Sequence, residues 1–381
     1  MKSKITYGII FFMFIFLLCG CSTSSEKDNI RNVSEYMKSD ISETPDISEN
    51  DVSNGLKNIV DCSGAEVEIP VEINRVISVN QPFCGFMTAM GIPDKLIGSH
   101  GSVLHHSWAP VFYDGFSEMT LYGYEPAPEA VYEADADLVV LNDALYAEEL
   151  RNAGIPAICF GYTNKEELFQ ALDLMGDIFG SPAVEYTQKW EKYLDDVIEE
   201  ISTEVADIPD EERKNVYYVN AAVGELSEDG IYNTFGGNSF VEYWINTIGA
   251  NLVTSPYKDV SQLDKEIVLS LNPNVIITSG YLEYQYRDLI KNSPLWKDNT
   301  AVKSESIYVM PTSMISYDRF AVELPIMLSY SANLLYPNKH EFNGIEELDN
   351  FYKEYYGKDF SEEELQNMLD GLNPDGTVMG K

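Results

Sequence analysis

Between residues 59 and 336 the chain alternates short, mainly apolar runs with longer amphipathic segments. The runs at 76–79 and 138–141 are typical of strands that are buried on both faces of a sheet. In segments such as 239–252 the apolar residues lie three and four positions apart, which is typical of helices packed on one face. Strands that alternate with helices in this way predict an α/β fold with mostly parallel sheets covered by helices.

A hairpin and one long helix are the other elements that the pattern predicts. Residues 59–79 alternate apolar and polar positions around Ser63 and Gly64, as two antiparallel strands joined by a tight turn do. Residues 181–206 form one helical pattern in which Ser181 is a candidate cap and Pro182 occupies a tolerated first-turn position. At 1.5 Å per residue this helix is roughly 35–40 Å long, which is enough to join two lobes.

The same pattern divides the chain into six segments. One α/β lobe precedes the long helix and a second one follows it. The last segment carries ten acidic residues and a predicted surface helix at 361–370. We expect a signal segment at 1–20, a flexible acidic tether at 21–57, an N-terminal lobe at 58–180, a linking helix at 181–206, a C-terminal lobe at 207–345 and an acidic tail at 346–381.

The amino terminus has the pattern of a secretory signal. Lys2 and Lys4 precede ten consecutive apolar residues at 9–18, which span only ~15 Å as a helix, about half of a bilayer core. The run ends in Leu-Cys-Gly-Cys and resembles the lipobox of bacterial lipoproteins, in which the residue at the position of Cys21 is lipidated. An ordinary secretory signal with an incidental cysteine is the alternative. The lipobox implies an extracytoplasmic protein that is held at the cell membrane by its lipid anchor only.

Charge excludes several classes of partner. The chain has 62 acidic and 25 basic residues, a net charge of −37, so phosphate backbones repel it and nucleic-acid binding is not expected. Its 45% hydrophobic and 12% aromatic residues are too many for a disordered acidic chain. Beyond the amino-terminal segment, the spacing of Cys62, Cys84 and Cys159 matches no zinc or CxxC pattern, and one disulfide among them remains possible.

Two glutamates occupy equivalent places in the two halves. Glu129 lies nine residues before strand residue Leu138, and Glu266 lies nine residues before strand residue Val275. Each opens a short predicted helix, where a carboxylate is favoured by the free N–H groups and the helix dipole. Either glutamate alone is explained as a helix-start residue. The matched pair instead predicts one docking point on each lobe.

The run DCSGAEVEIPVEINRVISV, the two glutamate units, the helix NSFVEYWINTIGANL and the segment SPLWKDNTAVKSESIYVMP resemble substrate-binding lipoproteins of ABC importers. The resemblance is to the iron-complex (siderophore or haem) and cobalamin class and covers roughly residues 58–340. It departs from the family at Asp135-Ala136-Asp137, where proline is common.

The resemblance implies two Rossmann-like lobes joined by one long helix, with the ligand between them. It also implies that Glu129 and Glu266 engage an ABC permease dimer, which works with ATPase subunits, and that the receptor is a monomer. No intrinsic cofactor is expected. The implied cargo is an iron complex, and cobalamin or another metal chelate such as a nickel complex is the alternative.

Candidate ligand residues follow from the loops at the carboxyl ends of the strands, where α/β folds bind ligands. The loop 99–125 holds three of the four histidines and several aromatic residues. Imidazole suits transition metals, phenolate oxygen suits ferric iron, and aromatic faces pack against planar rings. A loop that merely packs on its own lobe is the alternative. From this loop we select His105, His106, Trp108 and Tyr113.

The second lobe contributes four further candidates. Tyr232 lies beside glycines in GIYNTFGGNSF, and only six arginines occur in the whole chain. Arg287 and Arg319 fall in predicted cleft loops, with Tyr317 beside the latter, and a guanidinium suits an anionic ferric chelate. Arg319 has the alternative of pairing with Asp318 or Glu323. The sequence therefore predicts that His105 or His106, with Tyr232 and Arg319, contacts a metal chelate.

The sequence gives no support to an enzyme. It contains no GxSxG elbow, no HExxH and no GxxxxGKS phosphate loop. A secreted hydrolase and an adhesive surface lipoprotein are the remaining alternatives, and neither requires the matched pair of glutamates. We therefore expect a receptor that binds and delivers its cargo without catalysing a reaction.

Overall fold

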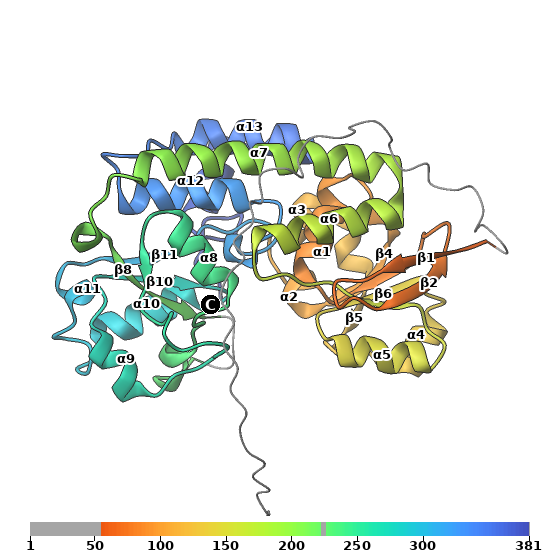
Figure 1. Ribbon diagram of the computed structural model, residues 1–381, viewed down its shortest axis with the longest axis horizontal. Coiled ribbons are helices and arrows are strands. Elements are labelled where there is room, and N and C mark those ends of the chain that lie inside the picture. The colour runs from red at the N-terminus through yellow and green to blue at the C-terminus, as the bar shows by residue number, and fades with distance from the viewer. Residues whose placement is uncertain (1–54, 222–225, 381) are drawn as a thin grey trace, which may run out of the picture. The chain divides into compact units, whose positions relative to one another are not determined.

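The computed structural model describes residues 55–221 and 226–380, and these described residues belong to one compact unit. The chain forms two α/β lobes, as the sequence predicts (Figure 1). The first lobe is built on a five-stranded sheet in the order β5-β4-β3-β6-β7, in which all neighbours are parallel. Its strands are β3 (Val76–Ser78), β4 (Leu96–His100), β5 (Thr120–Tyr122), β6 (Leu138–Leu141) and β7 (Ala157–Cys159).

The second lobe repeats this arrangement on a smaller scale. Its four-stranded sheet has the order β11-β10-β8-β9, again with all neighbours parallel. Central strands of both sheets are buried on both faces, which is why β6 is wholly apolar and β10 begins with three consecutive apolar residues. The strands are β8 (Asn215–Asn220), β9 (Asn251–Leu252), β10 (Val275–Ser279) and β11 (Ile307–Val309).

Helices cover both sheets. The first lobe has α1 (Gln81–Ala89), α2 (Gly101–Leu104), α3 (Ala109–Phe112), α4 (Pro128–Glu133), α5 (Ala144–Asn152) and α6 (Lys165–Phe179). The second lobe has α8 (Phe240–Thr247), α9 (Lys265–Leu271), α10 (Glu283–Asn292), α11 (Thr300–Lys303) and α12 (Leu324–Leu335). Among the described residues no helix is both long and apolar enough to cross a membrane.

The predicted hairpin is present. Strand β1 (Leu56–Val60) pairs antiparallel with β2 (Glu66–Pro70). In the turn, the Asp61 carboxylate accepts hydrogen bonds from the backbone N–H groups of Ser63 and Ala65, and Gly64 has a φ of +83° that favours glycine. Because β1 begins at Leu56, the folded body starts inside the stretch 21–57 that the sequence suggested as tether.

The predicted long helix is α7 (Ser181–Val205), and it runs along the top of both lobes in Figure 1. Its cap is Gly180 rather than Ser181, whose hydroxyl instead donates to Glu185. Apolar side chains on one face of α7 join a hydrophobic core that includes residues of both lobes. The two sheets are therefore tied to one shared core along this side.

The segment 346–381 differs from the acidic tail that the sequence suggested. Its residues belong mostly to two packed helices, α13 (Gly344–Tyr356), which begins just before the segment, and α14 (Glu362–Leu369). The second of these is the predicted helix at 361–370. In α13 the residues Leu348, Phe351, Tyr352 and Tyr355 are buried against the shared core, whereas Glu346 and Glu354 are exposed. The apolar residues of this segment repeat at helical spacing, but its ten acidic residues led to the prediction of a tail.

The three described cysteines are free. Cys84 and Cys159 are buried and Cys62 is exposed. None of these three cysteines forms the disulfide that the sequence left possible.

Candidate functional site

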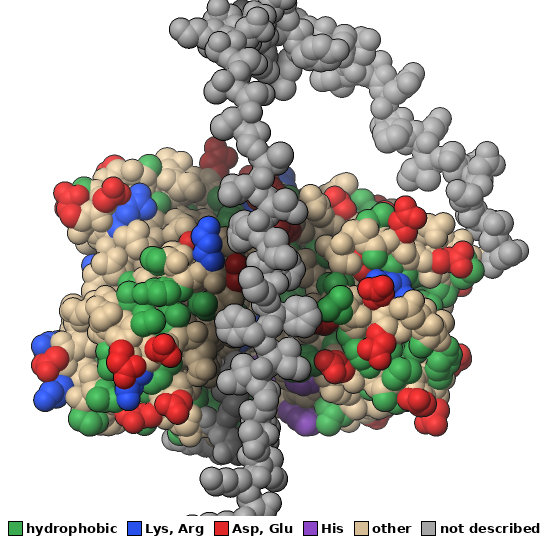
Figure 2. Space-filling model, turned by 60° about the horizontal axis from the view of Figure 1, so that its bottom comes forward, with side chains coloured by type: hydrophobic (Ala, Val, Ile, Leu, Met, Phe, Trp, Pro, Cys, Tyr) green, Lys and Arg blue, Asp and Glu red, His purple; other side chains and the backbone are tan. Residues whose placement is uncertain are grey.

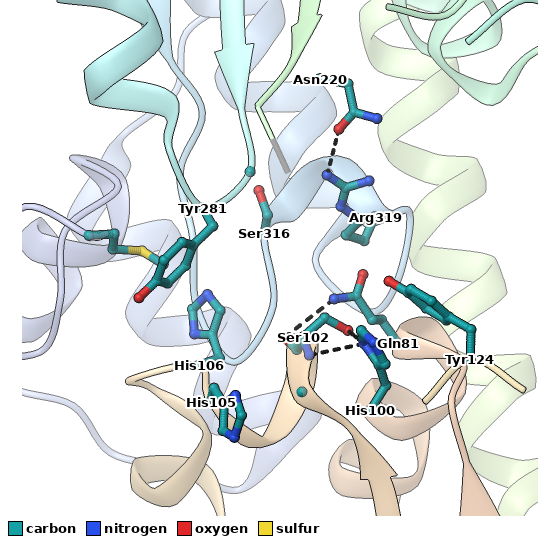
Figure 3. Close-up of a pocket in the computed structure, with 13 residues that line it drawn as sticks. Gln81, His100, Ser102, His105, His106, Tyr124, Asn220, Tyr281, Ser316 and Arg319 are labelled. Carbon is teal, nitrogen blue, oxygen red and sulfur yellow. Dashed lines mark hydrogen bonds between the residues drawn. The ribbon is translucent and has the colours of Figure 1, made fainter. Parts of the chain in front are cut away.

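A cleft of about 630 Å³ lies between the two lobes (Figure 3). Both lobes contribute to its walls, so its shape depends on how the lobes are held together. The first lobe provides Gln81, His100, Gly101, Ser102, His105, His106 and Tyr124, and the second provides Asn220, Gly280, Tyr281, Ser316, Arg319 and Met379.

Strand ends position these residues. His100 ends β4, Asn220 ends β8, Gln81 opens the helix that follows β3, and Gly280 follows β10 directly. The carboxyl ends of parallel strands meet at one edge of a sheet, and this edge is the usual ligand position in α/β folds. The cleft therefore lies where the edges of the two sheets face each other, as predicted from the sequence.

The first wall is a cluster of three histidines around the short helix α2. His100 caps α2, because its Nδ1 accepts a hydrogen bond from the Ser102 N–H at 3.1 Å, and its ring stacks on Tyr124 at 3.7 Å between centroids. Burial lowers the pKa of His100, and neighbouring His105 lowers it further. In Figure 3 the rings of His105 and His106 lie on the other side of Ser102 from this pair.

His106 is the most deeply placed of the three. Its Nε2 lies 3.3 Å from the Thr312 hydroxyl, and its Nδ1 is buried with no hydrogen-bond partner among the described residues. Burial lowers the pKa of His106 to about 4, so the ring is neutral at physiological pH. His106 lines the cleft, so a rotation of its ring that exposes Nδ1 would let this neutral imidazole bind a ligand or a metal in a chelate.

The stability of the fold should depend on His106 through this pKa. A free histidine titrates near 6.5, so between about pH 6.5 and 4 the unfolded chain binds a proton that the folded chain does not. The stability that the folded state has with a neutral His106 is present in full above pH 6.5, and it is lost as the pH falls from about 6.5 to 4. Wild-type protein should therefore lose about 2–3 kcal/mol more unfolding free energy between pH 7 and 4.5 than His106→Gln.

Urea unfolding at both pH values measures this difference. His105→Gln is the matched control, because His105 is exposed in the same loop, and it should keep the wild-type dependence. If wild-type protein and His106→Gln lose the same unfolding free energy between the two pH values, burial of His106 does not make the stability depend on pH.

The second wall carries the positive charge. Arg319 ends a short turn, donates from Nη2 to the Asn220 side chain at 3.3 Å, and places Nε 3.4 Å from a carboxylate oxygen of Asp318. Asp318 is buried and also accepts a hydrogen bond from the Tyr218 hydroxyl. Of the two partners suggested for Arg319, the structure shows Asp318. Glu323 instead accepts hydrogen bonds from Ser313 and Tyr356.

A buried carboxyl group lies close to this pair. Glu283 accepts a hydrogen bond from the Gly280 N–H at 2.9 Å and is almost completely buried. Burial, and secondarily the nearby charge of Asp318, raises the pKa of Glu283 well above its usual range. Burial and the charge of Asp318 therefore both disfavour the ionised form of Glu283 beside this ion pair.

Three of the eight ligand residues selected from the sequence line the cleft, namely His105, His106 and Arg319. Trp108 does not, because its ring is buried in the core and its indole N–H donates to the Leu372 carbonyl. Tyr113 packs its ring edge against Phe116 in the first lobe. Both belong to the loop that was expected to face the ligand, but the turns α2 and α3 direct them inward.

The other three residues lie elsewhere in the second lobe. Tyr232 is buried beside Trp296 in a separate core cluster. Tyr317 is buried, and its hydroxyl shares a hydrogen bond of 2.8 Å with that of Tyr352. Arg287 lies on α10, where it pairs with Asp288 and covers the ring of Tyr284. None of the three lines the cleft between the lobes.

Sequence reasoning missed several lining residues. His100 and Tyr124 lie in the loop 99–125 but were not among the residues selected from it. Asn220 and Gln81 were not singled out, although the end of a buried strand is a usable signal for both. Met379 carries no such signal, because its position depends on the packing of the carboxyl-terminal segment.

The two glutamates of the repeated unit are exposed on the same side of the described body. Glu129 lies in the first turn of α4 and Glu266 in the first turn of α9. Figure 1 shows α4 at the lower edge of one lobe and α9 at the lower edge of the other. Figure 2, turned toward this side, shows acidic side chains on both lobes and histidines at the inner edge of one of them.

One cluster outside the cleft has metal-ligating residue types. Glu200 and Glu204 near the end of α7 lie close to His340, and their ligand atoms are within 4.8 Å of one another. The His340 Nδ1 is 2.6 Å from a Glu204 oxygen, which is a hydrogen-bond distance. The contact is therefore explained without a metal.

Comparison with known proteins agrees with this architecture. The family model of the periplasmic binding proteins matches residues 118–314, just over half of the chain. The uncharacterized ABC transporter substrate-binding lipoprotein YvrC of Bacillus subtilis (strain 168) is 20% identical over 268 residues, which cover 68% of this chain and 79% of YvrC.

Solved structures of similar fold include two binding proteins. The molybdate-bound periplasmic binding protein MolA of Haemophilus influenzae superposes with a TM-score of 0.70 at 17% identity, covering 80% of this chain and 99% of MolA. The haem binding protein HmuT superposes with a TM-score of 0.57 at 16% identity, covering 78% of this chain and 96% of HmuT.

These findings confirm the fold and the family resemblance that the sequence predicts. The family is one of binding proteins rather than a class of enzymes. The matched residues include the whole linking helix and strands of both lobes. The chain belongs to the periplasmic binding protein family.

Proposed function

We propose that this protein is an extracytoplasmic solute-binding lipoprotein of an ABC importer, which captures an iron complex, either a ferric siderophore or haem, and delivers it to a membrane permease. The observation that carries the proposal is the composition of the cleft. Three histidines and one arginine line it, and none of its lining residues is acidic, although the chain has a net charge of −37.

This composition favours an anionic metal chelate over a free cation. Hard cations are held by several carboxylates, and the lining residues include none. A guanidinium instead stabilises carboxylate or phenolate oxygens of a chelate by charge-assisted hydrogen bonds. Imidazole nitrogens are suited to iron, nickel and copper.

The size of the cleft also favours a chelate. About 630 Å³ falls within the range of small-molecule sites, roughly 300–1,000 Å³. MolA binds molybdate, and a bare oxyanion of that kind would leave most of this cleft empty. HmuT binds haem, and a cargo of that size is compatible with the cleft. Cobalamin or a nickel chelate on the same scaffold is the alternative.

Delivery requires partners and an anchor. We assign Glu129 and Glu266 to docking on the permease dimer, whose ATPase subunits drive import, because they are exposed, matched and away from the cleft. Lipidation of Cys21, which lies outside the described residues, would hold a monomeric receptor at the outer face of the cell membrane. YvrC is named as an ABC transporter substrate-binding lipoprotein, which supports the lipid anchor and the partnership with a permease.

Calorimetric titration with defined chelates tests the proposed cargo. The set comprises haemin, a ferric tris-catecholate, a ferric tris-hydroxamate, cyanocobalamin, nickel–histidine and molybdate. We expect an iron complex to bind at micromolar or lower Kd, with the others at least tenfold weaker. Preferential binding of cyanocobalamin or nickel–histidine would replace the iron complex with that cargo.

The histidine wall should contribute directly to this binding. The double variant His105→Ala, His106→Ala removes both imidazoles from the cleft, and we expect its Kd for the bound iron complex to rise at least tenfold. Tyr113→Phe, which alters the same loop away from the cleft, should bind as the wild type does. Unchanged affinity in the folded double variant would exclude these histidines as ligand contacts.

A further inference from the structure

The carboxyl-terminal segment Asp370–Gly380, which we name the cleft strap, is bonded to both lobes. From the second lobe, Tyr284 donates to the Asp370 carbonyl, and Gln285 donates to the Met379 carbonyl at 2.7 Å. From the first lobe, the Trp108 indole N–H donates to the Leu372 carbonyl at 2.8 Å. The Ser107 hydroxyl lies 2.8 Å from the Asn373 side-chain oxygen, to which it donates. The cleft strap is therefore a connection between the lobes in addition to α7.

The cleft strap has a defined shape of its own. Leu372 pairs with Val378, and the Asn373 N–H donates to the Thr377 carbonyl at 2.8 Å. The Asp375 carboxylate accepts from both the N–H and the hydroxyl of Thr377. Gly371 has a φ of +66°, and a Cβ there would lie 2.8 Å from the Met310 carbonyl oxygen, so glycine is required for this close approach.

One residue of the cleft strap reaches the proposed ligand site. Met379 is 2% exposed and lines the cleft together with Tyr281 and His106. A methionine side chain is apolar and flexible, so it fills space beside a ligand without offering a charge. The hydrogen bond that Gln285 donates to the Met379 carbonyl holds Met379 in the wall of the cleft.

We propose that the cleft strap limits how far the lobes separate, and that Met379 determines the largest cargo that the cleft accepts. The proposal rests on the proposed function, in that the cleft must hold the cargo. Wide opening would pull Trp108 away from the Leu372 carbonyl and leave a buried indole N–H without a partner, which is unfavourable. The strap thus favours compact chelates over bulky ones.

Two iron(III) tripodal tris-catecholates of equal charge test the size limit, one with hydrogen and one with benzyl groups on its amide nitrogens. We expect the full-length wild type to bind the smaller probe at least tenfold more tightly. Met379→Ala should reduce this ratio at least threefold, because the smaller side chain leaves room for the larger probe. Met119→Ala, a methionine outside the cleft, should leave the ratio unchanged, and an unchanged ratio in Met379→Ala would overturn the role of Met379.

A measurement without ligand tests the limit on opening. The double variant Ser107→Ala, Trp108→Phe keeps an aromatic ring in the core but removes both hydrogen bonds to the strap. We expect amide hydrogen exchange of the cleft segments 100–106 and 279–284 to accelerate at least fivefold in this variant. Acceleration confined to 370–380 would overturn the proposed restraint.

The two experiments separate the inference from the proposed function. If no iron chelate binds the wild type but exchange accelerates in the cleft, the cargo assignment fails and the restraint stands. If the chelates bind but neither the affinity ratio nor the exchange responds, the inference fails and the proposed function stands.

Discussion

Replacing Glu129 and Glu266 together by alanine should abolish import of the cargo and leave its affinity for the purified protein unchanged. Both carboxylates are exposed in the first turns of short helices, one on each lobe, and neither lines the cleft. Loss of the two contacts therefore weakens docking on the permease without disturbing the ligand site. Uptake of a radiolabelled iron chelate by cells, together with calorimetry on the purified variant, measures both quantities.

The matched control removes two other exposed glutamates. Glu133 lies at the end of α4, and Glu211 lies on the surface of the second lobe. The variant Glu133→Ala, Glu211→Ala has the same change in net charge and should import normally. Normal import by the Glu129, Glu266 variant would show that docking uses a different surface.

Replacing Arg319 by glutamine should weaken binding of an anionic iron complex by one to two orders of magnitude. Arg319 is the one arginine or lysine among the residues that line the cleft, and charge-assisted hydrogen bonds of a guanidinium are roughly twice as strong as neutral ones. The effect should be smaller at high salt, because salt screens charges that solvent reaches. Calorimetric titration at two ionic strengths measures both effects.

This substitution also leaves Asp318 buried without its charged partner. Loss of one partner from a buried ion pair typically costs about 3–5 kcal/mol, so Arg319→Lys, which retains the charge, accompanies it. Arg287→Gln is the control, because Arg287 pairs with Asp288 away from the cleft. If folded Arg319→Gln binds the iron complex as tightly as this control does, Arg319 is not a ligand contact.

Most of the fold can be predicted from the spacing of apolar residues along the sequence. The buried strands have apolar side chains on both faces, and α7 carries a regular apolar stripe over 25 residues. Glu129 and Glu266 were recognisable because each opens a helix at the same spacing from a buried strand. The helix α13 was missed because its glutamates dominate the composition, although its aromatic residues repeat at helical spacing.

Individual cleft residues were harder to predict, for a physical reason. His106 and Trp108 are two positions apart, yet one lines the cleft and the other is buried under Leu372. Their directions depend on the turns α2 and α3, which occupy only four residues each and leave no periodicity to detect. Met379 depends on a contact between segments far apart in the chain, which no local pattern encodes.

The central claim is that the cleft between the lobes carries an iron complex. Native mass spectrometry of the protein purified from its own host under iron limitation tests it most directly. We predict one bound iron complex per chain, which is lost from the variant His105→Ala, His106→Ala, Arg319→Gln. A bound mass without iron in the wild type, or an iron complex that the triple variant retains, would contradict the account.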